Sequence, residues 1–169
     1  MQQAWISRYD SGVPSSLNYP EWTVPDLLRH SADRFANSPA LLFYGTCLSY
    51  GELDDLTTRF ANGLRRLGVG QGDRVAVMLP NIPQTVIAYY GILKAGAVVV
   101  PTNPLYVERE IQTQLTDAGT ETMVVLDLLY SRVRAVKEAA TLPERIIVTS
   151  VRDYLPFFKK LLYPIKARF

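Results

Sequence analysis

The sequence of 169 residues has one cysteine, Cys47, and one histidine, His30. A single cysteine cannot form a disulfide within the chain, and the opening MQQAWISRYD lacks the basic and apolar regions of a secretory signal. One histidine and one cysteine also provide no Cys/His metal cluster and no Ser/His/Asp or Cys/His catalytic set. These absences predict a reducing, cytoplasmic setting, no metal site and no catalytic residue in this chain.

Excess charge and long apolar runs are also missing. The net charge of +2 does not favour nucleic acid as a partner, and no apolar run approaches the roughly 20 residues that a membrane-spanning helix needs. The charge is unevenly distributed, because residues 1–150 carry 13 Lys+Arg and 15 Asp+Glu, whereas residues 151–169 carry five and one. We therefore expect a main domain over residues 1–150 and a basic segment over residues 151–169.

No glycine-rich phosphate loop is recognisable. The one glycine cluster, GVGQGD over residues 68–73, follows a predicted helix and precedes a predicted strand. That order is the reverse of what phosphate binding at a helix N-terminus requires. The cluster is interpreted as a helix stop and a turn.

The first third of the chain predicts a helix, a hairpin and a second helix. Thr23 and Asp26 form a capping-box pattern before a helix over about residues 24–36. Two short extended runs around Gly45 fit a hairpin. Apolar residues then recur at spacings of three and four up to Gly68, which predicts an amphipathic helix. The side of the first helix expected to pack inward carries Val24, Leu27, Leu28, Ser31 and Phe35.

From residue 74 short apolar runs alternate with helical patterns. The runs are RVAVML, AVVV, TMVVL and RIIV. Continuous apolar strands are typical of a sheet with helices on both faces, and repeated strand and helix units favour parallel pairing. The fold class predicted is α/β, an open doubly wound and mostly parallel sheet flanked by helices, with an N-terminal helix and hairpin.

In such sheets ligands bind beyond the carboxyl ends of the strands. The loops there begin with PNIP (residues 80–83), PTNP (residues 101–104) and Asp127. Proline removes the backbone N–H donors that a phosphate cradle needs, so none of these loops is expected to bind phosphate. A complete small module that binds a nucleotide at Asn81 or Asn103 is kept as an alternative.

The remaining titratable candidates have simple structural interpretations. We expect His30 to be a surface or partly buried helix residue and Cys47 to be a packed thiol in the hairpin. Asp54 and Asp55 follow a helix start and Lys94 lies in a last helical turn, so all three are interpreted as complementing helix dipoles.

The segment from LSYGEL (residues 48–53) to LKAGAVVVPTNP (residues 93–104) resembles the N-terminal part of the AMP-forming acyl-CoA synthetases, in the adenylate-forming superfamily. TNPLYVEREIQTQLTDAG and DYLPFFKKLLYPIKA resemble the bacterial long-chain fatty-acid–CoA ligases in particular. The resemblance implies that this chain is the first subdomain of the larger N-terminal domain of such an enzyme.

The resemblance also implies a reaction. A fatty acid and ATP with Mg²⁺ form an acyl-adenylate and pyrophosphate, and coenzyme A then displaces AMP. The phosphate loop, the ribose-binding acid and the catalytic lysine of the family lie further along in its members, so the chain alone is expected to be inactive, with no cofactor site. Another carboxylic-acid-activating member of the superfamily is the alternative.

One departure from the resembling sequences concerns a helix start. Similar enzymes have Ser or Thr at the position of Val107, where the side chain would pair with Glu110 in a capping box. Valine cannot accept that hydrogen bond, so we expect this helix to start about 1 kcal/mol less favourably.

The basic segment interleaves aromatic and aliphatic residues with Lys159, Lys160, Lys166 and Arg168. This composition is typical of a surface-lying amphipathic anchor, which would make peripheral contact with the inner face of a membrane. We favour the interpretation that its apolar side packs on the rest of a larger enzyme, because Pro156 and Pro164 are expected to interrupt a long helix, and keep the membrane anchor as the alternative. An exposed apolar face would also invite homo-oligomer formation.

Overall fold

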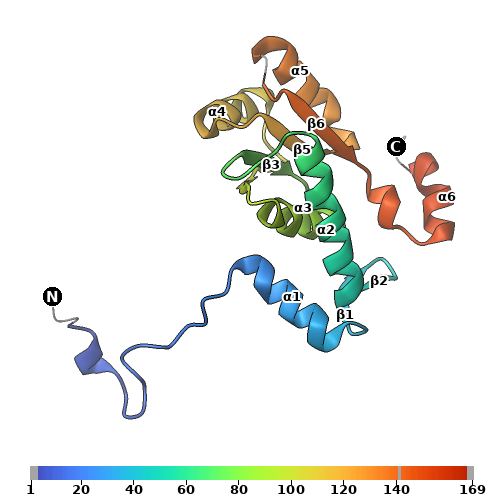
Figure 1. The fold of residues 1–169 in the computed structure, drawn as a ribbon. Helices are drawn as coiled ribbons and strands as arrows, with labels where there is room; N and C mark the ends of the chain where they lie inside the picture. Colours follow the sequence, from blue (N-terminus) through green and yellow to red (C-terminus); the bar gives the residue numbers. More distant parts are fainter. Residues whose placement is uncertain (1–3, 141, 167–169) are drawn as a thin grey trace.

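The computed structural model describes residues 4–140 and 142–166, which form a parallel sheet between helices, with a hairpin beside it (Figure 1). The α-helices are α1 (Val24–Phe35), α2 (Tyr50–Arg66), α3 (Pro83–Lys94), α4 (Glu108–Ala118), α5 (Tyr130–Ala140) and α6 (Phe157–Lys166). The strands are β1 (Pro39–Phe43), β2 (Thr46–Ser49), β3 (Arg74–Met78), β4 (Val98–Pro101), β5 (Thr122–Leu126) and β6 (Arg145–Thr149). Short 3-10 helices are η1 (Ile6–Arg8), η2 (Asp127–Leu129) and η3 (Val151–Tyr154).

The sheet has the order β4-β3-β5-β6, and every pairing is parallel. The chain passes from β3 outward to β4 and then crosses β3 to reach β5. The direction of winding therefore reverses between β3 and β5, which makes that position the topological switch point. The doubly wound parallel fold predicted from the sequence is confirmed.

Alternate residues of the inner strands enter two separate cores. Val75 and Val77 of β3 pack in the core that includes Leu64 of α2 and Ile92 of α3. The intervening residues of β3 and β5 pack with α4 and α5 in a second core, whose buried members are Ala76, Met78, Ile111, Leu115, Met123, Val125, Val133 and Val136. Nine of the ten side chains in β3 and β5 are buried, and the tenth, Arg74, is exposed. Both faces of the sheet are therefore covered, as the continuous apolar runs predict.

Helices α2 and α3 pack closely because α3 has a glycine where they meet. A Cβ atom built at Gly91 would lie 2.7 Å from Cδ1 of Phe60 and 3.0 Å from the carbonyl oxygen of Thr57. Real Cβ atoms do not approach neighbours so closely. The absent side chain lets the two backbones come together over the first core.

The hairpin turn is formed by Tyr44 and Gly45, whose φ angles are 50° and 100°. Two positive φ values suit a two-residue turn that matches the twist of the flanking strands. The turn connects the antiparallel pair β1 and β2 and closes on Phe43 opposite Thr46. The hairpin predicted around Gly45 is confirmed.

Side chains cap the first two long helices as the sequence predicts. The backbone N–H of Thr23 donates to Asp26 Oδ2 at 2.9 Å, and that of Ser49 donates to Glu52 Oε2 at 2.8 Å. The pKa of Asp26 is lowered chiefly by the Thr23 hydroxyl, and the pKa of Glu52 chiefly by the Ser49 backbone N–H, because these donors stabilise the ionised carboxylates.

The glycine cluster forms the turn between α2 and β3. Gly68 and Gly72 have φ angles of 84° and 83°, and the Gly70 N–H donates to Asp73 Oδ2 at 2.8 Å. The interpretation as a helix stop and turn is confirmed.

Two expectations about local packing are wrong. On α1 only Leu28 is buried, whereas Val24, Leu27 and Phe35 are 43–51% exposed. Because α1 packs mainly against α2 and α3, it covers a narrower stripe than its pattern indicated. The expected interruption by prolines holds at Pro156, which stands between η3 and α6, but not at Pro164, since α6 runs from Phe157 to Lys166. Pro164 stands in the last turn, so its missing N–H removes only one hydrogen bond near the helix end.

The start of α4 generates the first testable prediction. Val107 is its N-cap residue and 58% exposed, its N–H donates to Glu110 Oε2 at 2.9 Å, and its side chain makes no cap hydrogen bond. Val107→Thr adds the missing acceptor without losing much apolar burial, so it should stabilise the chain by about 1 kcal/mol and raise the melting temperature by about 2–4 °C. Val107→Ala is the control and should not stabilise. An unchanged or lower melting temperature for the threonine variant in calorimetry would contradict the cap.

The contact of α2 with α3 generates a second prediction. Gly91→Ala should destabilise the chain by about 1–3 kcal/mol, because the added methyl group meets Phe60 and backbone in a packed site. Gly63→Ala in α2 is the matched control, since a Cβ there has no neighbour within 4 Å. That control should gain about 0.5–1 kcal/mol from helix propensity. Urea unfolding of both variants measures the difference, and the same sign of change in both would refute the close-packing explanation.

Candidate functional site

The carboxyl ends of the strands are closed by hydrogen bonds within the chain. The Thr85 hydroxyl donates to the carbonyl of Pro80, and Ile82 N–H donates to the same oxygen at 2.8 Å. Asn103 Oδ1 accepts from the N–H of Leu105 at 3.0 Å. These polar groups of the loops after β3 and β4 therefore form hydrogen bonds within their own turns.

A side chain from α5 bonds to the loop between β4 and α4. Arg132 Nη1 donates to the carbonyl oxygens of Pro104 at 3.3 Å and Tyr106 at 2.8 Å. An arginine at this edge of a sheet is a potential phosphate ligand, but here it stabilises the loop that leads into α4. The sequence offers no signal for this contact, which spans 26 residues.

Gln84 is a buried polar residue that sequence reasoning missed. It lies in the first turn of α3, is 7% exposed, and its Nε2 donates to the carbonyl of Ser150 at 2.7 Å. Its Oε1 is buried and has no hydrogen-bond partner among the described residues. The contact joins the start of α3 to the end of β6.

Asn81 lines a shallow apolar groove at the same edge. The groove has a volume of about 310 Å³ and is lined by Leu41, Leu42, Phe43, Asn81, Ile82, Pro83, Thr85 and Val86. It contains no charged side chain. The lining of this groove therefore offers Asn81 neither the cation nor the glycines that a nucleotide phosphate would need. The cation near Asn103 is Arg132, which donates to the carbonyls of Pro104 and Tyr106.

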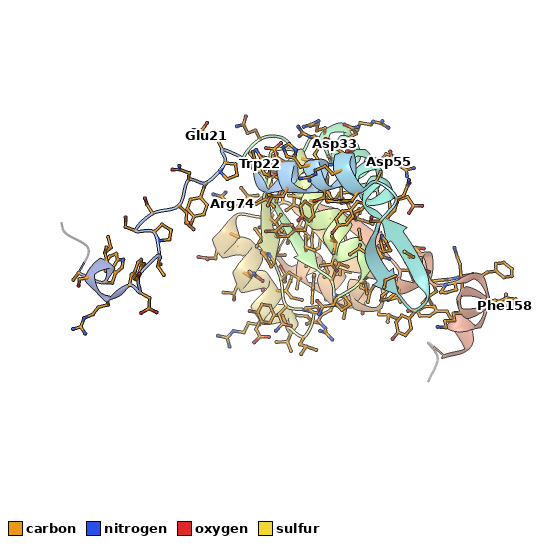
Figure 2. The ribbon with its side chains drawn as sticks, turned by 90° about the horizontal axis from the view of Figure 1, so that it is seen from below. Glu21, Trp22, Asp33, Asp55, Arg74 and Phe158 are labelled. Atoms are coloured by element: carbon orange, nitrogen blue, oxygen red, sulfur yellow. The ribbon has the colours of Figure 1, made fainter. Side chains whose placement is uncertain are left out.

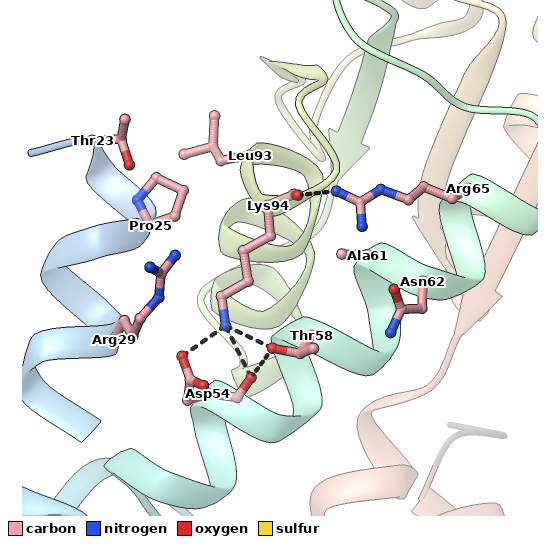
Figure 3. A pocket seen from close by; sticks show the side chains of 10 residues that line it. All are labelled: Thr23, Pro25, Arg29, Asp54, Thr58, Ala61, Asn62, Arg65, Leu93 and Lys94. Carbon is pink, nitrogen blue, oxygen red and sulfur yellow. Dashed lines mark hydrogen bonds and ion pairs between the residues drawn. The ribbon is translucent and has the colours of Figure 1, made fainter. Parts of the chain in front are cut away.

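Lys94 lies in a second cavity, of about 460 Å³, between α1, α2 and α3 (Figure 3). Its Nζ donates to Asp54 Oδ1 at 2.7 Å, to the Asp54 carbonyl at 3.0 Å and to Thr58 Oγ1 at 2.9 Å. Three bonds satisfy all three ammonium donors, and the side chain is only 12% exposed. The ammonium group thus connects α3 to α2 and has no free donor for a ligand.

The backbone carbonyl of Lys94 also accepts a hydrogen bond. Arg65 Nη2 donates to it at 2.7 Å, so a guanidinium of α2 caps the C-terminus of α3 (Figure 3). The interpretation that Lys94 complements the α3 dipole is incomplete. Lys94 does lie in the last turn of α3, but its ammonium group bonds to Asp54 and Thr58 of α2. Asp54 and Asp55 lie beyond the first turn of α2, where acidic residues would complement its dipole, so that interpretation of them is wrong. Asp55 instead pairs with Arg59 at 2.8 Å.

Neither His30 nor Cys47 forms a hydrogen bond or an ion pair with another side chain among the described residues. The ring of His30 stacks on that of Trp22 with 4.1 Å between the centroids. Cys47 is exposed, so the prediction of a packed thiol is wrong. It faces outward because it lies opposite Leu42 on the outer side of a hairpin that is only two strands wide. No group of three His, Cys, Asp or Glu that could hold a metal ion occurs within residues 4–140 and 142–166.

The basic segment forms η3 and α6, and α6 exposes a group of large apolar side chains. Phe157, Phe158 and Leu161 are 75%, 78% and 65% exposed, and Figure 2 shows Phe158 pointing away from the rest of the chain. Lys160 is exposed beside them. The side chain of Lys166 and the whole of Arg168, both expected at this surface, lie outside the described residues. Among the helices that are described, none is both long and apolar enough to cross a bilayer.

Comparison with known proteins gives consistent matches over nearly the whole chain. The chain is 44% identical over 167 residues to a long-chain-fatty-acid–CoA ligase of Bacillus subtilis (strain 168), which covers 99% of this chain and 30% of that protein. It is 34% identical over 164 residues to a protein of the same name from Escherichia coli O157:H7, covering 96% of this chain and 29% of that one. The chain thus spans about 30% of the length of these relatives.

The fold matches solved structures as well. The crystal structure of a long-chain-fatty-acid–CoA ligase from Archaeoglobus fulgidus superposes with a TM-score of 0.76 at 28% identity, over 87% of this chain and 32% of that one. Residues 28–167 match the family described as AMP-binding enzyme. Because that match extends over much more than half of the sequence, this chain belongs to the AMP-binding enzyme family.

Proposed function

We propose that this chain serves as the N-terminal part of a long-chain fatty-acid–CoA ligase. Such an enzyme converts a fatty acid, ATP and coenzyme A into acyl-CoA, AMP and pyrophosphate through an acyl-adenylate. The observation that carries the proposal is the 44% identity over 99% of the chain to a ligase of that name. Another acid-activating enzyme of the superfamily is the alternative.

The described residues of this chain do not fit ATP phosphates or Mg²⁺. The loops at the sheet edge contain prolines and bond to themselves, and the described residues hold no group of carboxylates suited to a metal. We therefore propose that the chain provides no catalytic residue, and that ATP, Mg²⁺ and coenzyme A are bound elsewhere in the whole ligase. Residues 1–150 would form its first subdomain and residues 151–169 a separate segment.

A chimeric enzyme tests this role. The 30% of the Bacillus subtilis ligase that this chain matches would be replaced by residues 1–169. The chimera should form palmitoyl-CoA only when ATP and coenzyme A are both present, as measured by liquid chromatography. The Bacillus subtilis ligase that lacks the matched part and carries nothing in its place is the control and should be inactive.

The isolated chain provides the complementary test. It should not exchange pyrophosphate into ATP in the presence of palmitate, and calorimetry should find no saturable micromolar binding of ATP or AMP. Exchange activity would reveal a catalytic site in this chain, and micromolar nucleotide binding would favour the independent module. A folded but inactive chimera would count against the ligase role.

We also propose that the segment at residues 151–169 makes peripheral contact with the inner face of a membrane. Its three exposed apolar side chains on α6 and its excess of positive charge support this, since basic residues near anionic lipid contribute about 1 kcal/mol each. Lys159, Lys160, Lys166 and Arg168 are the cations that the sequence offers for it. Self-association through the same apolar side chains is the competing use of this surface.

Vesicle co-sedimentation separates these uses. We expect the chain to pellet with vesicles of 30% phosphatidylserine in phosphatidylcholine and to pellet less with phosphatidylcholine alone. Raising the salt concentration should weaken binding, because screening reduces the attraction between exposed charges and the surface. Equal pelleting on both vesicles would contradict an electrostatic contribution.

A further inference from the structure

The three large apolar side chains of α6 that are described as exposed occupy one side of the helix. At about 100° per residue, Phe157, Phe158 and Leu161 fall within an arc of about 100°. Each is at least 65% exposed. We refer to these three side chains as the apolar arc. On the same geometry Lys159 lies about 150° from the middle of the arc, on the opposite side of the helix.

Lys159 is already bound on that opposite side. Its Nζ donates to the carbonyl oxygen of Tyr44 at 2.9 Å and lies 5.4 Å from the centroid of the Tyr44 ring. Tyr44 belongs to the hairpin turn between β1 and β2. A hydrogen bond and a cation–π contact thus connect residues 115 positions apart in the chain.

The start of α6 touches the same turn. A Cβ atom built at Gly45 would be 3.7 Å from Cγ of Pro156, so the proline ring lies directly against the turn. The Tyr44 ring packs edge-on to Phe43, with 4.8 Å between the centroids. Lys159 and Pro156 together hold one side of α6 against the hairpin, which leaves the apolar arc on the side facing away.

We infer that Lys159 is a positioning residue for membrane binding and not a lipid ligand. Its contact with Tyr44 orients α6 so that the apolar arc faces an anionic lipid surface, with Lys160 beside the arc as the cation that meets the headgroups. This inference rests on the proposed membrane contact. The sequence alone groups Lys159 with the other cations that would meet the lipid. The contact with Tyr44 gives Lys159 a different role.

Charge complementarity selects an anionic membrane as the occupant of this face. Residues 151–169 carry five Lys or Arg and one Asp, whereas residues 1–150 carry 13 Lys or Arg and 15 Asp or Glu. The apolar arc therefore stands in the one strongly basic part of the chain. Burial of the arc by the rest of a ligase is the competing outcome.

Two lysine variants test the inference because each removes one positive charge. Vesicle affinity of the 169-residue chain would be measured for Lys159→Met and Lys160→Met on vesicles of 30% phosphatidylserine, at low and high salt. Lys160→Met should weaken binding about fivefold at low salt, as loss of one surface cation does, and the loss should fade at high salt. Lys159→Met should weaken binding by at least tenfold, and that loss should persist at high salt.

The apolar arc needs its own variants. Phe157→Ser with Phe158→Ser should reduce vesicle affinity at least tenfold, whereas Leu105→Ser, at a position that is 83% exposed outside the basic segment, should leave it unchanged. Leu161→Ser is a second arc variant in case the double variant folds poorly by circular dichroism. As a direct readout, Phe158→Trp fluorescence should be quenched by brominated lipid, and adding Lys159→Met should abolish the quenching.

The possible results are distinguishable. If the unsubstituted chain binds no vesicle, the proposed membrane contact itself fails. If it binds but the two lysine variants behave alike at both salt concentrations, the positioning role is overturned and the membrane contact stands. If Phe158→Trp in the chimeric ligase is shielded from brominated lipid, the rest of the enzyme covers the arc, which overturns the inference.

Discussion

The constraint on which the structure depends is that the two inner strands must be covered on both faces. Every side chain of β5 is buried, as are four of five in β3. A parallel strand with apolar residues on both sides is stable only between two layers of helices. This requirement sets α2 and α3 on one face and α4 and α5 on the other, and it produces the reversal of winding between β3 and β5.

The same constraint accounts for the hydrogen bonds that close the loops after β3 and β4 at the sheet edge. Loops that leave buried strands must satisfy their backbone groups locally, and the loops after β3 and β4 do so with Thr85, Asn103 and Arg132. Their prolines stiffen the turns and remove donors. An edge built in this way supports neighbouring structure, which fits a chain that spans about 30% of the ligases it resembles.

Two contacts of the helices outside the sheet are made by charged side chains whose partners are distant in the chain. Lys94 binds Asp54 of α2, and Lys159 binds Tyr44 of the hairpin. Both lysines lie at sequence positions with a simpler explanation, a helix C-terminus for one and a basic patch for the other. In each case the partner belongs to an element separated by at least 36 residues, so charge pattern alone could not identify the contact.

The fold was accessible from the sequence because its signals are local. Capping pairs such as Ser49 and Glu52, the positive-φ position at Gly45 and the periodicity of apolar residues act over a few residues, and the structure confirms each of them. Family membership was likewise carried by contiguous segments such as LKAGAVVVPTNP.

Which side chains are exposed and which groups they bind were decided only by the tertiary structure. Whether Cys47 is packed, how much of the apolar side of α1 is covered and which group binds Lys159 depend on which elements lie next to them. The sequence by itself therefore determined the strands, helices and winding of this chain. Its tertiary structure decided which cations are bound and which apolar side chains remain exposed, because those properties depend on contacts between residues far apart in the chain.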